Sequence, residues 1–366
     1  MRIAIRAGGT GTRLWPWSRS GRPKQFLPMF EGKSCVQMAY ERFVGAGVVR
    51  PEDVYISVGS AHEALVRAHM PQVPEQNVIV EPAKMDTAAA IGLETVVVAG
   101  ADADVIVASL GSDHYVEKPD QFVAALRAAE GFLRENPGCL LAIACEPTRV
   151  ETNYGHIRKG RSLGESGGMC VYEASEFLEK PEPELARQYT VSGEYLWNAN
   201  FFAWRAGTLM AQFEEFEPQM HSVFMELLEE RDSGGFRSAV QAKYPGLKKI
   251  AIDYAVMEPA SRKGRLAVLP VAMGWSDIGN WSSLTDAFSP DAQGNLLVGP
   301  ARTIETSNST IHVANSGRKI VATIGLKDMV VVDTEDALLV CPKELCGRVK
   351  ELVQSLEKDP EGRQLI

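Results

Sequence analysis

Residues 7–26 combine the side chains and glycines that proteins use to bind phosphate groups. The stretch reads AGGTGTRLWPWSRSGRPKQF and follows a short apolar run at residues 3–5. Glycine tolerates positive φ and has no side chain to block a bulky anion, so successive backbone N–H groups can point at phosphate oxygens. The spacing of Gly8, Gly9 and Gly11 therefore predicts a phosphate cradle directly after a strand.

Two basic residues add charge to this cradle. Arg13 offers a planar fork that suits two phosphate oxygens, and Lys24, which follows Pro23, offers a compact positive charge. The two best-known glycine-rich phosphate motifs, GxxxxGK(S/T) and GxGxxG, are both absent from the stretch. Taken alone, the glycines could form a strand-to-helix turn with incidental basic neighbours, so the prediction depends on the whole string.

Two acidic residues follow apolar stretches. Asp113 comes shortly after the apolar residues 104–110, and Asp277 lies in a loop at residues 274–281 where two glycines bracket it. In open α/β sheets ligands bind beyond the carboxyl ends of the strands, so Asp113 should face the same crevice as the cradle. A triphosphate there would need a divalent cation and a carboxylate to hold it. The alternative for Asp113 is an Asx turn or a helix cap.

Three polar-aromatic segments come later, in a region of weaker periodicity. They read N-Y-G at residues 153–155, F-L-E-K-P at 177–181 and W-N-A-N-F-F at 197–202. Taken singly, each has an ordinary explanation as a turn, a surface salt bridge or a strand edge with aromatic packing. Asp253 lies near the start of a predicted helix at residues 252–259, where we expect it to act as a cap.

Composition limits the classes of function. The chain has 366 residues, 45% of them hydrophobic, which predicts a full core and two domains or one domain with an appendage. A net charge of -9 and a pI near 5.4 argue against binding to nucleic acid or to an anionic membrane. No run reaches the ~18 apolar residues of a membrane span and no signal peptide is evident, so we expect a cytoplasmic protein. The scattered cysteines predict neither a zinc site nor a disulfide framework.

Apolar strands and helices alternate through the first part of the chain. We expect strands at residues 3–5, 54–58, 78–80, 104–110 and 140–144, separated by helices at 35–44, 62–70, 87–99 and 121–135. Strands without polar alternation that are separated by helices favour a parallel sheet covered on both faces. The fold prediction is therefore an αβα sandwich, with a long structural helix further on at residues 210–230.

The character of the sequence changes near Gly294. Short β-rich runs at residues 310–313, 320–324 and 329–332 are punctuated by turn residues, and an amphipathic helix is expected at 342–358. We place a domain boundary between Asp286 and Gly294, which gives one domain at residues 1–288 and a β-rich domain at 294–366. The runs alone are too few to establish a repeat.

The full string G-G-x-G-T-R-L-x-P, with the later P-K-Q-F, resembles the signature of sugar-1-phosphate nucleotidyltransferases. The Trp15-Pro16 and Gln25-Phe26 pairs resemble the mannose-1-phosphate guanylyltransferase branch of that family. The Y-G, E-K-P, W-N and W-S-D-x-G segments follow in the family's order, so the resemblance covers residues 1–290. It implies a Rossmann-like αβα sandwich with a mixed, mainly parallel sheet, followed by a small left-handed β-helix-like domain used for contacts in a homodimer.

The resemblance also implies a reaction. A phosphate oxygen of mannose 1-phosphate would attack the α-phosphorus of GTP, giving GDP-mannose and pyrophosphate. A phosphate monoester is already largely ionised at neutral pH, so catalysis reduces to alignment and charge neutralisation. Arg13 would neutralise the departing pyrophosphate, and Lys24 would approach the α-phosphate, where charge accumulates.

Each quoted segment acquires an expected role in this scheme. Mg²⁺ would be held by Asp113 and Asp277, which with Arg13 and Lys24 are the expected catalytic residues. The residues expected to bind the nucleotide are Ala7, Gly8, Gly9, Gly11, Thr12, Arg13, Glu81 and Asp113. Those expected to bind the sugar phosphate are Tyr154, Gly155, Glu179, Lys180 and Asn198.

The chain departs from the family's pattern in places, and two alternatives stay open. Arg6 replaces an apolar residue, Met85 and Asp86 replace an Arg-Asn pair after Glu81-Pro82, and N-A-N at residues 198–200 replaces N-S-G. One alternative is an enzyme for another pair of substrates, such as glucose 1-phosphate with UTP. The other is a silent subunit that senses the nucleotide sugar, against which the presence of Arg13, Lys24 and both aspartates argues.

Overall fold

A computed structural model of the chain describes residues 1–9, 11–30, 32–232, 234–314 and 319–366. The chain divides into two compact units. The first holds Met1–Gly8, Val36–Ser112 and Lys118–Trp275, and the second holds Gly9–Cys35, Asp113–Glu117 and Ser276–Ile366. The chain therefore passes from one unit to the other between Gly8 and Gly9, inside the predicted cradle, and again just before Asp113.

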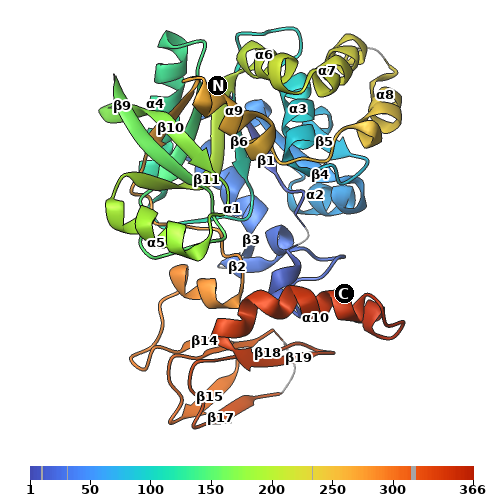
Figure 1. Cartoon of the computed structure of the whole chain (residues 1–366). Coiled ribbons are helices and arrows are strands. Elements are labelled where there is room, and N and C mark those ends of the chain that lie inside the picture. Colours follow the sequence, from blue (N-terminus) through green and yellow to red (C-terminus); the bar gives the residue numbers. More distant parts are fainter. Residues whose placement is uncertain (10, 31, 233, 315–318) are drawn as a thin grey trace. The chain divides into compact units, whose positions relative to one another are not determined.

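A mixed sheet forms the centre of the first unit (Figure 1). Four strands at one end are parallel and lie in the order β5 (Val78–Glu81), β4 (Val54–Gly59), β1 (Arg2–Arg6) and β6 (Ile106–Gly111). The sheet continues with β11 (Tyr195–Arg205), β8 (Leu140–Cys145), β12 (Leu266–Pro270), β10 (Met169–Leu178) and β9 (His156–Ser166). Strand β11 is antiparallel to β6 and β8, whereas β8 and β12 are parallel. Each strand predicted from an apolar run is present, and the mixed sheet is confirmed.

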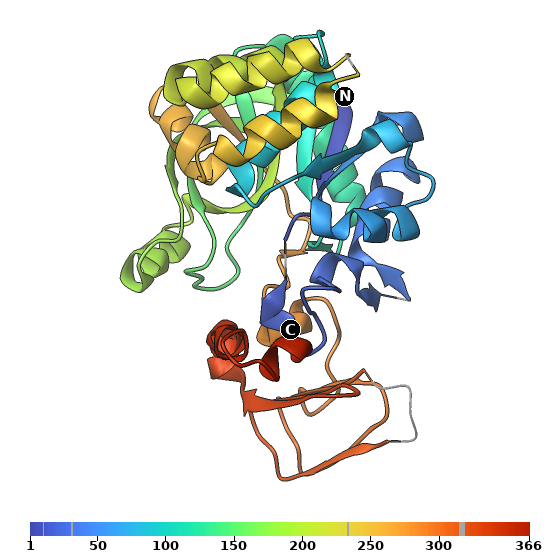
Figure 2. The ribbon, with the colours of Figure 1, turned by 90° about the vertical axis from the view of Figure 1, so that its right-hand side faces the viewer.

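Helices cover both faces of this sheet. On one face, strand residues such as Ala4 and Val107 share a core with α3 (Asp86–Ala99), α6 (Ala206–Phe216), α7 (Pro218–Glu230) and α8 (Phe236–Lys243), and the last three lie together in Figure 2. On the other face, α1 (Cys35–Val44) and α4 (Pro119–Glu135) meet through Phe43 and Phe122, whose rings are 5.8 Å apart. The shorter helices are α2 (Glu63–His69), α5 (Pro183–Ser192) and α9 (Glu258–Arg262). The layers confirm the predicted αβα sandwich.

Helices α3 and α7 touch closely because α3 has a glycine at the contact. A Cβ atom on Gly92 would lie 2.0 Å from the ring of Phe224, which is fully buried. Burying a phenylalanine contributes roughly 1.5–3 kcal/mol, and a packed interior has no room for an added methyl group. The contact holds α3, and with it Glu94, against α7.

The single helix predicted at residues 210–230 is wrong. Helix α6 ends at Phe216 and α7 begins at Pro218, with Glu217 between them at φ -137° and ψ 63°. Proline has no N–H for the preceding turn and pushes the residue before it out of the helical region. At the first position of a new helix the same residue is well tolerated. Pro218 therefore divides the amphipathic stretch into two helices.

The second unit combines the cradle segment with the β-rich C-terminal part. Its strands β14 (Leu296–Val298), β16 (Thr310–Val313) and β18 (Met329–Asp333) are parallel neighbours, as are β15 (Ala301–Ile304) and β17 (Val321–Ile324). Parallel strands from successive turns of the chain build two sheets, which confirms the predicted β-helix-like domain. Strand β19 (Leu338–Pro342) is antiparallel to β18, and α10 (Val349–Leu356) follows.

The domain boundary predicted between Asp286 and Gly294 stays a prediction. The compact units follow contacts instead, and they group the cradle segment with everything from Ser276 onward. None of the helices in the described ranges combines the length and the hydropathy needed to span a bilayer.

Candidate active site

The cradle segment makes a tight loop at Gly11 in the second unit. Gly11 has φ 59°, and its carbonyl accepts a hydrogen bond from the N–H of Leu14 at 3.2 Å, in the turn η1 (Thr12–Leu14). A Cβ atom on Gly11 would lie 2.6 Å from Cβ of Lys24 and 2.8 Å from its backbone nitrogen. Positive φ and close backbone approach both require glycine. This glycine therefore lets the two ends of the loop touch and brings Lys24 to the cradle.

The Lys24 side chain joins three segments that are far apart in sequence. Lys24 begins the turn η2 (Lys24–Phe26) and is only 3% exposed. Its Nζ lies 3.2 Å from Oδ2 of Asp113 and also donates a hydrogen bond to the backbone carbonyl of Asp277. The next residue, Gln25, donates from Nε2 to the carbonyl of Gly9 at 2.8 Å. The structure thus brings the cradle, Asp113 and the Asp277 loop together around one ammonium group.

Asp113 is held in its ionised form by this ammonium group. Surrounding protein raises the pKa of Asp113, but the charge of Lys24, helped by His114, outweighs that effect and leaves the pKa at about 2. Asp113 follows β6 and precedes β7 (Tyr115–Val116), which pairs with β13 (Trp275–Ser276). At neutral pH its carboxylate is therefore a full negative charge, able to bind a cation in place of Lys24.

The Asp277 loop is shaped by its own short-range hydrogen bonds. Oδ1 of Asp277 accepts from the N–H of Gly279 at 2.8 Å, and a Cβ on Gly279 would lie 2.4 Å from the other carboxylate oxygen. Asn280 then caps the turn η8 (Trp281–Asp286) through a reciprocal pair of bonds with Ser283. These contacts fix the Asp277 carboxylate on a rigid turn.

Three tryptophans anchor the cradle segment to the C-terminal part of the same unit. The indole N–H of Trp281 donates to the carbonyl of Trp15 at 2.9 Å, and that of Trp15 donates to the carbonyl of Leu365 at 2.7 Å. The ring of Trp17 lies 4.2 Å from that of His312 on β16. Burial lowers the pKa of His312 to about 4, so this histidine is a neutral packing residue near pH 7. The β-rich domain therefore supports the loop that carries Gly11 and Lys24.

In the first unit, Glu81 ends β5 and is held by two hydroxyl groups. Its carboxylate accepts hydrogen bonds from the hydroxyls of Ser57 at 3.0 Å and of Tyr244 at 2.7 Å. A Cβ atom on Gly8 would lie 3.4 Å from Oε1 of Glu81, so the first cradle glycine is its neighbour. Burial raises the pKa of Glu81, although both hydroxyl groups oppose the rise. Tyr244 is held neutral for the same reasons, burial and the adjacent carboxylate, which raise its pKa.

A further carboxyl, that of Glu94, interacts with Glu81 through its charge. Glu94 is fully buried in helix α3, among mostly apolar residues, and its Oε2 accepts from the hydroxyl of Ser109 at 2.5 Å. The same hydroxyl is bonded to the guanidinium of Arg6. Burial raises the pKa of Glu94 to about 7, even though the charge of Arg6 lowers it. Its Oε1 has no hydrogen-bond partner among the described residues.

The five residues expected to bind the sugar phosphate converge in the first unit. A Cβ atom on Gly155 would lie 2.5 Å from Oε2 of Glu179 and 3.1 Å from Cβ of Asn198, so these three residues are in direct contact. Glu179 is ion-paired with Lys180, whose φ is 50°. The ring of Tyr154 packs edge-on against Trp197 at 5.3 Å, next to Asn198. These residues form one cluster on the segment directly after β10, on β11 and on the loop before β9.

Asp253 belongs to this cluster, and the predicted cap role is wrong. Asp253 begins the short π-helical turn at Asp253–Met257 rather than preceding it, and the residue before the turn makes no side-chain cap bond. Its carboxylate instead accepts from Nδ2 of Asn198 at 3.0 Å. Burial, and then the charge of Glu179, raise the pKa of Asp253 to about 7. The side chain is directed by its tertiary contacts, which a local pattern does not reveal.

Arg6 supports the strand bulge that presents Asn198. The pairing of β11 with β8 shifts between Asn198 and Phe201, and Asn200 within the bulge has φ 56°. Nη2 of Arg6 donates to the carbonyl of Asn200 at 2.8 Å and to its Oδ1 at 3.0 Å. The N–H of Asn200 in turn donates to Oδ1 of Asn198 at 2.9 Å. Two departures from the family's pattern, at Arg6 and at Asn200, are thus in direct contact.

Comparisons with known proteins agree with this arrangement. The family model described as nucleotidyl transferase matches residues 4–294, and the one described as MannoseP isomerase/GMP-like beta-helix domain matches 301–356. A mannose-1-phosphate guanylyltransferase of Escherichia coli K12 is 33% identical over 97% of this chain and 73% of its own length. One from Klebsiella pneumoniae is 34% identical over 97% of this chain and 74% of its own. This chain belongs to the mannose-1-phosphate guanylyltransferase family.

A solved structure from Thermus thermophilus, described as a mannose-1-phosphate geranyltransferase, superposes on most of the chain. It is 34% identical, has a TM-score of 0.84, and covers 97% of this chain and 99% of its own. A mannose-6-phosphate isomerase structure from Helicobacter pylori, 20% identical over 75% of this chain and all of its own, has a TM-score of 0.58 and shows the fold alone. The fold predicted from the resemblance to the guanylyltransferase family is thus confirmed by a structure of 34% identity.

The residues predicted from the family signature fall into the two groups described above. Ala7, Gly8 and Glu81 are in the first unit with the sugar-phosphate cluster, and Gly9 and Gly11 are in the second with Lys24 and both aspartates. Thr12 begins the turn η1. Arg13 follows it, exposed, and makes no hydrogen bond or ion pair within the described part of the chain. The roles of all these residues stay predictions.

Several residues of the polar network escaped the sequence-based site prediction. Among them are Arg6, Glu94, Asn200 and Tyr244, all in the first unit. Glu94 had a signal, because a lone acid in the apolar run AAAIGLETVVVA indicates a buried charge that needs a partner. Arg6 also had one, as a cation at the end of a buried strand. Their partners are tens to hundreds of residues away, so only the fold identifies them.

Proposed function

We propose that this chain transfers the guanylyl group of GTP to mannose 1-phosphate, with pyrophosphate as the second product. The observation that carries the proposal is the Lys24 ammonium, held between the Asp113 carboxylate and the Asp277 carbonyl beside the Gly11 turn. A buried cation placed among glycines and acids has little structural purpose, since its burial costs free energy. It suits a site where phosphate charge is to be neutralised.

The bond changes are those of an in-line displacement at phosphorus. A phosphate oxygen of mannose 1-phosphate bonds to the α-phosphorus of GTP, and the bond from that phosphorus to the bridging oxygen of the β-phosphate breaks. Pyrophosphate leaves with the electron pair, and no proton has to be removed from the attacking monoester at neutral pH. The chain is therefore required to align the two phosphates and to balance their charge. Lys24 and the exposed Arg13 supply the cations for this task.

The first unit would recognise the neutral parts of the two substrates. The Glu179 carboxylate would accept hydrogen bonds from sugar hydroxyls, and the Asn198 amide would donate or accept them. The Lys180 ammonium, next to Glu179, would bind the sugar phosphate. Glu81 could accept hydrogen bonds from the N–H groups of guanine, which uracil and thymine do not match, and Gly8 is its neighbour. Tyr244 would keep the Glu81 carboxylate in place while the base binds.

The donor set of the second unit fits Mg²⁺. This ion binds through one or two carboxylates together with substrate phosphates and water, so it needs no cage of protein ligands. Within the described residues there is no group of three or more histidine, cysteine or acidic side chains placed to hold a metal, which fits that mode. Asp113 and Asp277 would hold the ion, and Asp113, with its low pKa, is ionised for that purpose. Bound there, Mg²⁺ supplies positive charge to phosphate oxygens.

Pyrophosphate release tests the proposal. Purified protein is incubated with Mg²⁺, each nucleoside triphosphate and each of several sugar 1-phosphates, and pyrophosphate is measured. Turnover highest with GTP and mannose 1-phosphate supports the proposal, and faster turnover with UTP and glucose 1-phosphate overturns its specificity. Binding of GDP-mannose by calorimetry without any turnover would instead identify a sensor subunit.

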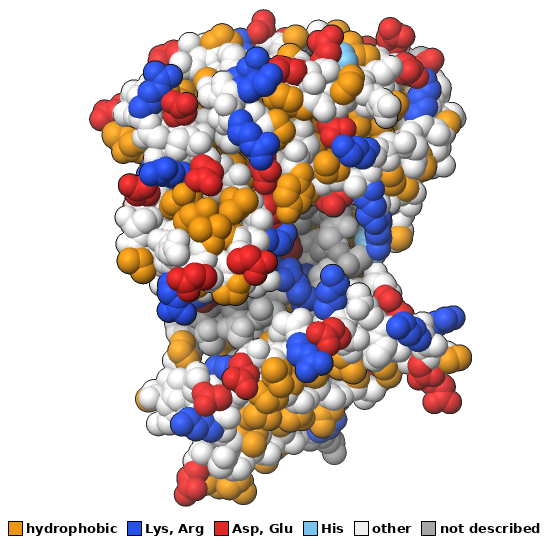
Figure 3. Space-filling view, in the orientation of Figure 1, with side chains coloured by type: hydrophobic (Ala, Val, Ile, Leu, Met, Phe, Trp, Pro, Cys, Tyr) orange, Lys and Arg blue, Asp and Glu red, His pale blue; other side chains and the backbone are white. Residues whose placement is uncertain are grey.

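A homodimer and a cytoplasmic location complete the proposal. The outer face of the β-rich domain exposes Ile304 and Ile324, which are paired in register and are 60% and 72% exposed. Apolar side chains also gather over this C-terminal part in Figure 3. Exposed apolar patches of this kind mark association surfaces, so a second copy of the chain is the proposed occupant. Light scattering on the wild type and on Ile324→Lys tests it, since a dimer should become a monomer.

A further inference from the structure

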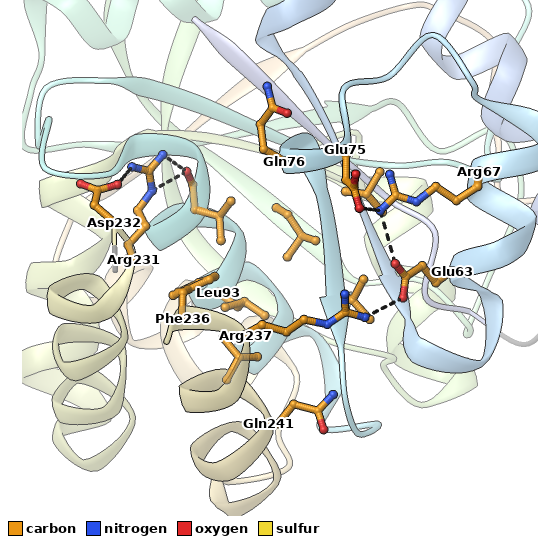
Figure 4. Close-up of a pocket in the computed structure, with 15 residues that line it drawn as sticks. Glu63, Arg67, Glu75, Gln76, Leu93, Arg231, Asp232, Phe236, Arg237 and Gln241 are labelled. Atoms are coloured by element: carbon orange, nitrogen blue, oxygen red, sulfur yellow. Dashed lines mark hydrogen bonds and ion pairs between the residues drawn. The ribbon is translucent and has the colours of Figure 1, made fainter. Parts of the chain in front are cut away.

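A cavity of about 360 Å³ lies beside β5, the edge strand of the first unit's sheet (Figure 4). Apolar side chains form much of its wall, among them Leu93 and Val97 on α3 and Phe236 and Val240 on α8. Its volume falls within the range of small-molecule sites, which are typically ~300–1,000 Å³ and mostly apolar with a few polar groups. None of the residues predicted to bind substrates lines it.

One rim of the cavity carries two arginines that share a single carboxylate. In Figure 4, Arg67 and Arg237 point toward Glu63 from opposite sides. Nη2 of Arg67 lies 3.3 Å and Nη2 of Arg237 3.2 Å from the carboxylate oxygens of Glu63. A further contact joins Arg67 to Glu75 at 3.5 Å, but the Glu75 side chain is 84% exposed. Ion pairs to an exposed carboxylate contribute little stability, so an incoming anion can replace the contact of Arg67 with Glu75 at small cost.

The elements that line the cavity also carry, or directly precede, the residues around the predicted base site. Strand β5 supplies Val80 to the lining and Glu81 directly after it. Helix α8 supplies Val240, and the residue following its last turn is Tyr244, whose hydroxyl donates to Glu81 at 2.7 Å. Helix α3 supplies Leu93, and the next residue is Glu94. Any movement of β5 relative to α8 therefore changes the geometry of the Glu81–Tyr244 hydrogen bond.

We propose that this cavity binds a small amphipathic anion and that its occupancy weakens nucleotide binding. The apolar body of the ligand lies against Leu93, Val97, Phe236 and Val240, and its anionic group lies between Arg67 and Arg237. Each guanidinium has further N–H donors beyond the one directed at Glu63, in a fork suited to a carboxylate or sulfonate. The binding step is independent of the proposed reaction, whereas the coupling to GTP rests on it.

Binding is tested with anilinonaphthalene sulfonate, an aromatic anion that fluoresces in apolar sites. The full chain is titrated with this probe, with no nucleotide or metal present. The expected result is one saturable site that is weakened about tenfold or more in the double variant Arg67→Ala/Arg237→Ala. Phe236→Ala, which removes part of the apolar wall and no charge, should weaken binding as well. Unchanged probe affinity in both variants overturns the site.

Arg262→Ala is the matched control for loss of an exposed arginine. Arg262 is 72% exposed and pairs with Glu258 at 3.3 Å, much as Arg237, 73% exposed, pairs with Glu63, but it does not line the cavity. Probe affinity should stay at the wild-type level in this variant. A loss equal to that of the double variant would mean that the probe responds to net charge and would overturn the assignment.

The coupling is tested through GTP. At saturating probe, the KM for GTP should rise about fivefold or more, with a smaller change in the KM for mannose 1-phosphate, and the rise should disappear in the Arg67→Ala/Arg237→Ala variant. An unchanged KM for GTP in the presence of bound probe overturns the proposed coupling, whereas the proposed binding site still stands. If the protein binds the probe but turns over no substrate, the proposed reaction is wrong instead. Failure of the coupling and failure of the reaction are therefore distinguishable.

Discussion

The two polar groups of this chain differ in the sign of their excess charge. The cradle sequence at residues 7–26 contains four cations and no acid, and Asp113 and Asp277 come from elsewhere in the second unit. The polar network of the first unit has the opposite balance, because among the described residues the cations that act on its four carboxyls, Glu81, Glu94, Glu179 and Asp253, are Arg6 and Lys180.

This difference in charge suits the two kinds of recognition proposed above. In the second unit the acid is fully ionised, since Lys24 holds the pKa of Asp113 at about 2. In the first unit, burial and mutual repulsion raise the pKa of Glu94 and of Asp253 to about 7, so these carboxyls are partly protonated near neutral pH. Full charges suit phosphates and a cation, whereas partly neutral carboxyls suit hydrogen bonds to hydroxyls and to a base.

The largest effect should come from the charged group of the second unit. Asp113→Asn and Asp277→Asn should each lower kcat by about a thousandfold or more, on the scale of lost metal chemistry, with little change in Tm. Lys24→Ala should lower kcat more than it raises KM, because its charge acts on the transition state. Steady-state kinetics with GTP and mannose 1-phosphate measure both quantities.

Asp336→Asn is a control for these charge changes. Asp336 pairs with Arg19 in the same unit, but its side chain is 47% exposed. Near-normal activity is expected for this variant. Near-normal turnover in Asp113→Asn or Asp277→Asn would contradict the catalytic role proposed for the charged group of the second unit.

Gly11→Ala should have the next largest effect, through geometry alone. The added methyl group would lie 2.6 Å from Cβ of Lys24 at a residue with φ 59°, so the loop has to open and move the ammonium. We expect a loss in kcat of roughly a hundredfold with the charge of the site unchanged. Gly21→Ala is the control in the same segment, because its Cβ would meet nothing within 4 Å. Equal activity of the two variants would show that the Gly11 turn does not position Lys24.

Arg6→Met should destabilise the polar network of the first unit. Removing this cation leaves Glu81, Glu94 and Asp253 without their shared counter-charge and leaves the Asn200 carbonyl without its donor. Loss of one partner from a buried charge network costs about 3 kcal/mol of unfolding free energy. Urea unfolding measures the cost, and a raised KM for mannose 1-phosphate should accompany it. Arg2→Met, at the other end of β1, should cost clearly less.

Much of the architecture could be predicted because its signal is local. The strands at 54–58, 104–110 and 140–144 are continuous apolar runs between helical stretches, and such runs have few alternatives. The β9–β10–β11 segment could not be assigned in the same way. Strand β9 alternates buried, intermediate and exposed residues irregularly, and its pairing with β10 shifts register repeatedly. Tertiary pairing, not periodicity, makes these residues strands.

The residues of the candidate site also differ in whether a local sequence signal predicts them. Gly11, Lys24, Asp113 and Asp277 could be predicted because each belongs to a short string whose residue types have a chemical reason to occur together. The bonds from Arg6 to Asn200 and from Tyr244 to Glu81 join residues 194 and 163 positions apart. No spacing rule covers such distances, so the support of the site follows only from the sheet order that places β1, β5 and β11 in one sheet.

The smallest effect is a pH dependence of stability that comes from Glu94. Its pKa is raised to about 7 in the folded chain by burial, from an ordinary value of 4.5, so between these values the folded state binds more protons than the unfolded state. Stability from this group therefore falls as pH rises, by about 2 kcal/mol between about pH 5 and 7. In Glu94→Gln this part of the slope should disappear, which urea unfolding at several pH values measures against the wild type.

Asp253 has a pKa raised in the same direction, so the wild type should retain a falling slope and only the difference between the two proteins reports Glu94. Asp113 has the opposite sign, because its lowered pKa adds stability above its ordinary value of 3.8 and loses it as pH falls toward 2. The difference in charge between the two groups therefore predicts that the free energy of unfolding falls in two pH ranges. It falls above pH 5 because of the first unit and below pH 4 because of the second. If the unfolding free energy of Glu94→Gln changed with pH in parallel with that of the wild type, Glu94 would be ionised in the folded chain. The difference in charge between the two units would then not include Glu94.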